Sequence, residues 1–197
     1  RFVPKHKILR WGMFMSTLSN IVLGAYNALL IFHIRDTLGM SVAVTGMIMT
    51  VSSVVSLLAG ALIAPRIGGR LNRSSAMIAT LVIQGMGVVF VGLATNLVML
   101  TIAQACYMGA LTIYTINWRS LRQTVTPGNM IGRVSGVSRG IAYTGASIGG
   151  FIGGYLLLHL TAASVFVIDG LIVCLVALTA LLGSMRREER QHMNMSA

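Results

Sequence analysis

The sequence predicts an all-α membrane protein with six transmembrane helices, and three observations lead to that fold class. Of the 197 residues, 55% are hydrophobic and only 10% are charged, whereas a water-soluble domain usually has about 25% charged residues. Six stretches reach the length of about 20 apolar residues that crossing a bilayer requires. The basic residues gather between these stretches. This composition argues against a soluble enzyme, a disordered chain and a disulfide-rich secreted domain.

The six predicted spans follow one another with short connections. Helices are expected because every backbone polar group in lipid must be satisfied internally, and the stretches lack the alternation of polar and apolar residues that marks a membrane barrel. The first apolar run is too long for a cleavable signal peptide. The predicted spans are residues 11–34, 42–64, 76–95, 97–118, 134–158 and 164–183.

The formal net charge of +11 is interpreted as a topology signal, so we expect no nucleic-acid partner. Thirteen basic residues lie before the first span, between the second and third, between the fourth and fifth, or after the sixth, which places them on one side of the membrane. The connections on the opposite side hold only Arg35, next to Asp36. By the positive-inside rule both termini are therefore expected in the cytoplasm, with Trp11 and Trp118 in the aromatic belt on that side. The remaining basic residues between spans and at the ends are Arg1, Lys5, Lys7, Arg10, Arg66, Arg70, Arg73, Arg119, Arg122, Arg133, Arg186, Arg187 and Arg190.

Small residues recur at four-residue spacing in two spans. Gly145, Gly149 and Gly153 form such a stripe in the fifth span, and the second span has a weaker one from Gly46 to Gly60. A stripe without side chains lets another helix approach closely, which is how helices pack in lipid. Tight packing is one interpretation, and sliding or rocking of helices during a transport cycle is the other.

Polar stripes mark the first and fourth spans. They consist of uncharged amides and phenols, which either bond neighbouring helices or line a shared aqueous cavity. The candidate substrate-binding residues on these stripes are Asn20, Asn27, Gln104, Tyr107 and Tyr114.

Two ionisable residues fall within the predicted spans, and such residues are functional candidates by default. Asp169 lies toward the outer side, where it is expected to face outward and reach the headgroups, and it is the candidate for ion coupling. Arg139 lies toward the cytoplasmic side, where it either snorkels or takes part in gating. Because they lie toward opposite faces, we expect no pairing between them.

An enzyme is not expected. Ser147 lies in a G-x-S-x-G pattern, but a nucleophilic serine needs a base within hydrogen-bond reach, and the nearest candidates, His33 and His159, lie toward the outer face. Cys106 and Cys174 show no metal-binding or redox spacing. The sequence therefore predicts no cofactor and no metal.

A family resemblance enters at residues 117–136. The spacing of Gln123, Pro127, Gly132 and Arg133, followed by the glycine-rich fifth span, resembles the loop before the eleventh helix of major facilitator superfamily exporters. Within that superfamily it is similar to the branch of the enterobactin exporter and related drug-efflux proteins. Residues 60–73 resemble the cytoplasmic loop between the second and third helices of each half, but without its usual aspartate.

The resemblance implies the carboxy-terminal half of a twelve-helix transporter, as one domain of two three-helix inverted repeats, residues 1–96 and 97–197. The first and fourth spans would line the cavity, the second and fifth would contact the other half, and the third and sixth would face lipid. Gating would involve the cytoplasmic arginines Arg66, Arg70, Arg133 and Arg139.

The implied function is export of a small organic molecule, such as a drug or siderophore, by alternating access and proton antiport. It implies a bacterial inner membrane, with the lipid bilayer, the substrate and an amino-terminal half or second subunit as partners. A proton carrier in that amino-terminal half is a simpler expectation than Asp169. The alternative is a non-transporting six-helix module, such as a sensor, scaffold or assembly partner.

Overall fold

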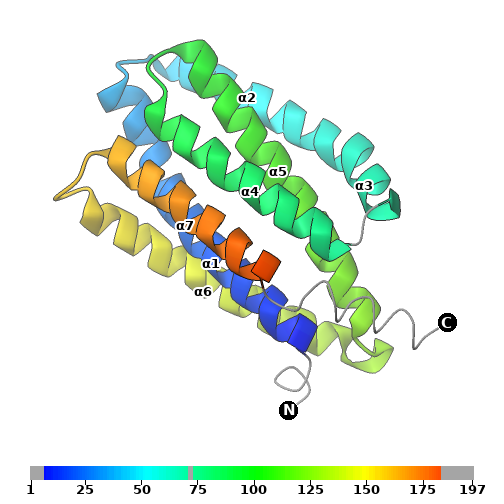
Figure 1. Cartoon of the computed structure of the whole chain (residues 1–197). Helices are drawn as coiled ribbons and strands as arrows, with labels where there is room; N and C mark the ends of the chain where they lie inside the picture. The colour runs from blue at the N-terminus through cyan, green and yellow to red at the C-terminus, as the bar shows by residue number, and fades with distance from the viewer. Residues whose placement is uncertain (1–6, 71–72, 183–197) are drawn as a thin grey trace.

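The computed structural model describes residues 7–70 and 73–182, and this part of the chain is helical, with no strand. Its long helices run up and down beside one another, joined by short connections (Figure 1). The all-α prediction is therefore confirmed. The helices are α1 (Lys7–Phe32), α2 (Val42–Leu58) with its extension α3 (Ala64–Arg70), α4 (Arg73–Leu93), α5 (Leu97–Val125), α6 (Ile131–Leu156) and α7 (Ala162–Leu182).

Each predicted span coincides with one long helix or helical run of the described residues, and five of these are apolar enough to cross a membrane by length and composition. The exception is α6, which has 26 residues and is about 39 Å long at 1.5 Å per residue. Its glycines, serines and two arginines dilute its apolar content. The five apolar segments are Leu9–Thr37, Val42–Ile67, Ser75–Leu93, Leu97–Val125 and Ala162–Ala180.

The helix of the fourth predicted span extends beyond residue 118, because α5 continues from Trp118 to Val125. This segment contains no helix breaker before Pro127. At its end, the Thr126 hydroxyl donates to the Arg122 carbonyl oxygen at 2.7 Å. The predicted loop therefore begins one to two turns later, and its arginines are held on a helix.

The second span also extends beyond its predicted end. A single π-helical turn (Ala59–Ile63) follows α2 and leads directly into α3. Pro65 lacks the N–H that an α-helix would need at this point, and the wider turn before it accommodates that missing donor. Residues predicted as loop are thus helical up to Arg70.

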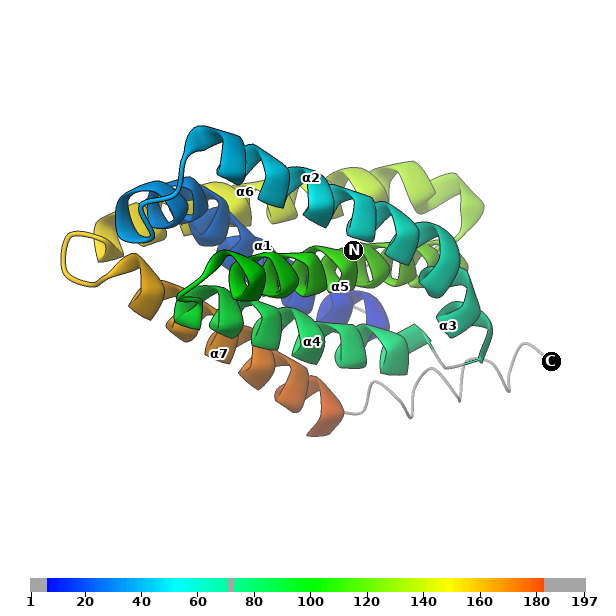
Figure 2. The same cartoon turned by 90° about the horizontal axis from the view of Figure 1, so that it is seen from above.

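The helices pack in the order α6, α1, α7, α4, α5, α2, and α1 also makes a sparse contact with α5. Figure 2 shows α2 and α7 at opposite edges, with α5 and α4 between them. Residues distant in sequence are therefore neighbours, because α1 packs against both of the last two helices.

Glycines bring α1 and α6 unusually close. A Cβ atom at Gly149 would lie 1.8 Å from the carbonyl oxygen of Ile21, and one at Gly24 would lie 1.8 Å from that of Ala146. Neither position has room for a side chain. The predicted stripe thus packs tightly, as the spacing indicates, but against α1 of the same chain rather than another half.

The other side of α6 has no packing partner among the described residues. A Cβ atom at Gly140 or Gly154 would meet nothing within 4 Å, and Phe151 is 87% exposed. In α2, Thr50 and Ser53 are also exposed. The end of the predicted stripe of α2 faces α5: the hydroxyls of Ser56 and Thr112 lie 2.5 Å apart, and a Cβ atom at Gly60 would lie 3.1 Å from the Thr112 side chain.

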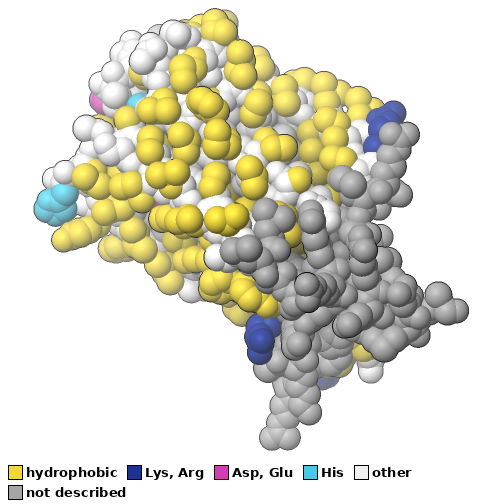
Figure 3. Space-filling model, viewed as in Figure 1, with side chains coloured by type: hydrophobic (Ala, Val, Ile, Leu, Met, Phe, Trp, Pro, Cys, Tyr) yellow, Lys and Arg dark blue, Asp and Glu magenta, His cyan; other side chains and the backbone are white. Residues whose placement is uncertain are grey.

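Much of the described surface is hydrophobic. Figure 3 shows hydrophobic side chains across one face of the bundle, with Lys and Arg along one side and His and Asp near the opposite end. Leu57 and Val98 are 71% and 67% exposed. Trp118, by contrast, is not exposed at the surface. It was predicted in the aromatic belt, but it is buried against Gly12 of α1.

Candidate functional site

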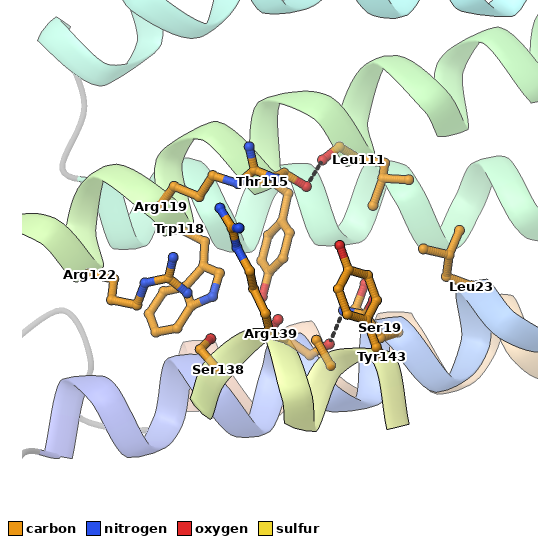
Figure 4. Close-up of a pocket in the computed structure, with 14 residues that line it drawn as sticks. Ser19, Leu23, Leu111, Thr115, Trp118, Arg119, Arg122, Ser138, Arg139 and Tyr143 are labelled. Atoms are coloured by element: carbon orange, nitrogen blue, oxygen red, sulfur yellow. Dashed lines mark hydrogen bonds between the residues drawn. The ribbon is translucent and has the colours of Figure 1, made fainter. Parts of the chain in front are cut away.

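A polar pocket lies where α1, α5 and α6 meet, and its volume is about 210 Å³. It forms because α1 packs closely on α6 but only sparsely on α5. Figure 4 shows its side chains converging from the three helices. The lining residues are Ser16, Ser19, Asn20 and Leu23 of α1, Leu111, Tyr114, Thr115, Trp118, Arg119 and Arg122 of α5, and Ser138, Arg139, Ala142 and Tyr143 of α6.

Two aromatic rings pack together in the core beyond the pocket. The Tyr26 ring of α1 and the Tyr107 ring of α5 have centroids 4.4 Å apart, one turn beyond the last pocket residues, Leu23 and Leu111. Neither ring lines the pocket. Both are fully buried and fill the space between α1 and α5 beyond it.

Hydrogen bonds within the helices satisfy several of the polar groups. The Asn20 amide nitrogen donates to the Ser16 carbonyl oxygen at 2.7 Å, and the Thr115 hydroxyl donates to the Leu111 carbonyl oxygen at 2.8 Å. These bonds orient both side chains along their own helices. The Asn20 amide oxygen has no hydrogen bond to another described residue.

Arginines line the end of the pocket toward the last turns of α5. Figure 4 shows Arg139 reaching from α6 toward Arg119 on α5. Arg122 is only 6% exposed, and its guanidinium carbon lies 5.8 Å from the centre of the Trp118 ring. Its Nε is buried without a hydrogen-bond partner among the described residues.

Two of the five predicted substrate-binding residues line this pocket, Asn20 and Tyr114. Asn27 is exposed elsewhere on α1. Gln104 and Tyr107 are fully buried in the bundle, outside the pocket lining. The stripe on α5 is thus divided, because its first half is packed within the bundle and its second half borders the pocket.

The family model of the Major Facilitator Superfamily matches residues 12–194. The chain belongs to this superfamily. A comparison with curated proteins found no match.

Two solved structures of a bacterial homologue of the human lysosomal transporter Spinster share the fold. In the inward-facing, unoccupied conformation, the TM-score is 0.67 at 21% identity, covering 89% of this chain and 42% of the other. In the inward-facing, occupied conformation, the values are 0.62, 18%, 92% and 44%. This Major Facilitator Superfamily chain therefore spans less than half the length of those structures, and the likeness establishes the fold alone.

The predicted gating arginines of this superfamily chain do not form one cluster. Arg139 lines the pocket, whereas Arg133 is exposed in the first turn of α6. Arg66 donates to the Leu62 carbonyl oxygen of its own helix. Arg70 ends α3, and its side chain is outside the described residues, as are Arg1, Lys5, Arg186, Arg187 and Arg190.

Asp169 is oriented differently from the prediction. Instead of reaching outward, it is 7% exposed, and its Oδ2 atom is buried without a hydrogen-bond partner among the described residues. It interacts electrostatically with Tyr107 of α5. Close packing brings it inward: a Cβ atom at Gly170 would lie 2.5 Å from the Gly85 carbonyl oxygen, so α7 presses this face against α4.

Sequence reasoning missed Gln84 and Ser19, which connect this buried region to the pocket. The Gln84 amide nitrogen on α4 donates to the Ser19 hydroxyl on α1 at 3.1 Å, and Ser19 also lines the pocket. Gln84 also lies beside Tyr107 of the buried region, without a hydrogen bond to its hydroxyl. A glutamine in the middle of an apolar span is the signal that would have identified this position.

Ser147 is not arranged as a nucleophile. Its hydroxyl donates to the Tyr143 carbonyl oxygen of its own helix at 3.1 Å. The hydroxyl proton is therefore engaged with the backbone one turn earlier rather than with a base.

Tyr107→Phe is expected to leave the free energy of unfolding unchanged or raise it by about 1 kcal/mol, because the buried hydroxyl has no hydrogen-bond partner among the described residues and removing it relieves an unsatisfied polar group. Tyr107→Ala, the matched control, should lower it by about 3 kcal/mol through a cavity. Thermal unfolding in detergent measures both. A clear loss with phenylalanine would contradict the absence of a partner.

Proposed function

We propose that this chain forms one half of a secondary active transporter that exports a small organic molecule by alternating access. The observation that carries the proposal is the polar pocket between α1, α5 and α6. Transporters of this kind bind substrate near the midplane between two helical repeats or halves, which then rock around it. Asn20 and Tyr114 would contact the substrate.

The unpartnered faces of α2 and α6 support a second half or subunit beside them. Phe151 and Tyr155 of α6 are 87% and 62% exposed. They lie opposite the glycines that pack on α1, and the matched structures extend well beyond the length of this chain. An amino-terminal six-helix half covering these faces would enclose the pocket.

Proton antiport is proposed for the coupling, with Asp169 as the proton carrier. A carboxylate buried at this depth is costly unless it is neutralised or has a role. The hydrogen bond between Gln84 and Ser19 offers a connection from the pocket to the Asp169 region. Protonation of Asp169 would thereby alter the packing of helices that line the pocket.

Orientation and substrate range belong to the same proposal. The positive-inside bias supports cytoplasmic termini in a bacterial inner membrane. The resemblance to the enterobactin-exporter and drug-efflux branch supports a drug or a siderophore as the exported molecule. Arg66, Arg70 and Arg133 would act at the cytoplasmic gate.

The test uses inverted membrane vesicles containing the natural protein that carries this chain. With the vesicle interior acidified, we expect uptake of ethidium or of a catechol siderophore, and we expect a protonophore to abolish it. Vesicles without the protein are the control. Failure to move either probe or any member of a wider drug panel would overturn the transporter proposal and favour the non-transporting module.

A further inference from the structure

The pocket between α1, α5 and α6 has an unbalanced positive charge. Arg119, Arg122 and Arg139 all line it. The acidic residues among those described are Asp36, in the helical turn that follows α1, and Asp169, on α7, and neither lines the pocket. Three guanidinium groups therefore share one small space without a carboxylate from the described part of the chain.

Of the three arginines, Arg122 has the least favourable environment for its charge. Its side chain is 6% exposed, and Arg119 and Arg139 both repel it electrostatically. A buried charge is expensive unless it is paired and hydrogen-bonded. The Trp118 ring at 5.8 Å offsets part of this cost, but the buried Nε has no hydrogen-bond partner among the described residues.

We propose that this pocket binds an organic anion, with its carboxylate or phosphate group held by Arg122, Arg119 and Arg139. Guanidinium groups suit this role because they form bidentate, charge-assisted hydrogen bonds to such groups. The inference rests on the proposed transport function and names its substrate class.

The rest of the pocket determines what the anion is attached to. Away from the arginines, Leu23, Leu111 and Tyr114 present apolar and aromatic surface. The volume of about 210 Å³ is below the roughly 300–1,000 Å³ that encloses a drug-sized ligand. This half therefore holds an aromatic ring system with one anionic group, or the anionic end of a larger molecule.

The experiment compares two probes of nearly equal shape, naphthoate and neutral naphthamide. Their binding to the natural protein in phosphatidylcholine nanodiscs is measured by equilibrium dialysis. We expect naphthoate to bind at least about tenfold more tightly than naphthamide, and Arg122→Gln to remove that preference, because a hydrogen bond to a charged group is lost. Equal binding of the two probes to the unaltered protein would overturn the inference.

Two further variants separate a local from a general effect of charge. Arg139→Gln also lies in the pocket lining but at an exposed position, so it tests the site if Arg122→Gln fails to fold. Arg133→Gln removes an exposed arginine of α6 outside the pocket and should leave the preference unchanged. A loss with Arg133→Gln equal to that with Arg139→Gln would contradict a specific site.

Adding phosphatidylglycerol to the nanodiscs distinguishes two sources of the anion. Undiminished naphthoate binding identifies a soluble organic anion, whereas competition identifies a lipid headgroup, and either result supports an anion site. Proton-driven vesicle uptake of the catechol siderophore or of any other transport probe separates this inference from the proposed function. Transport without a naphthoate preference overturns the anion site alone, and arginine-dependent naphthoate binding without any transport overturns the transport function alone.

Discussion

Asp169→Asn is expected to lower proton-driven transport by about a hundredfold, equivalent to roughly 2.7 kcal/mol. Asparagine keeps the shape of the side chain but cannot take up or release a proton. Uptake into acidified vesicles measures the effect. Exchange of substrate between the two sides without a gradient should persist, because that process needs the pocket but no net proton movement.

The position of Asp169 makes this variant informative. Its carboxylate is 7% exposed, with a buried oxygen lacking a partner among the described residues. An amide in place of this carboxylate would therefore break no hydrogen bond seen in the structure, and the variant should fold. Any loss of transport is then attributable to protonation rather than to lost packing.

Asp36→Asn is the matched control, because Asp36 is exposed in the helical turn after α1. It should leave proton-driven transport unchanged. Asp169→Glu keeps a titratable group and should retain part of the activity. Full gradient-driven transport by Asp169→Asn would remove Asp169 as the proton carrier.

Gly149→Ala is expected to lower the free energy of unfolding by about 3 kcal/mol, at the upper end of the usual overpacking cost. The added Cβ would lie 1.8 Å from the Ile21 carbonyl oxygen and 2.9 Å from the Ile21 Cα atom. These are backbone atoms, which no side-chain rotation can move away. α1 and α6 must therefore separate. Thermal unfolding in detergent, followed by circular dichroism, measures the loss.

The same helix offers a matched control for this substitution. A Cβ atom at Gly140 or Gly154 would meet nothing within 4 Å, so alanine at either position should leave stability unchanged or raise it by up to about 1 kcal/mol through helix propensity. If Gly149→Ala were as stable as these controls, the close packing of α1 on α6 would be wrong.

For the glycine stripe of α6, residue spacing predicts close packing but not the partner helix. Four-residue spacing predicts that some helix comes close, because spacing alone defines a face without side chains. It does not identify that helix, since any backbone can occupy such a face. The structure assigns it to α1, with Gly149 against Ile21.

In the candidate site, too, the sequence predicts some features and leaves others to the tertiary structure. Asn20 and Tyr114 were predicted and line the pocket, whereas Gln104 and Tyr107 lie on the same stripe but are covered. Helical spacing places these residues on one face of α5. It does not predict which part of that face a neighbouring helix covers, because that depends on where the two helices cross. Arg122 was predicted only as part of the charge bias, and its burial depends on α5 extending beyond residue 118.

The sequence by itself determined the fold class, because hydrophobic length and scarce charge are properties of each segment that the bilayer requires independently of its neighbours. The tertiary structure alone decided which polar residues share a space. It turned Asp169 inward, buried Trp118, and gathered three arginines around one pocket. These outcomes depend on helix partners and crossing points, which arise from contacts between segments far apart in the chain.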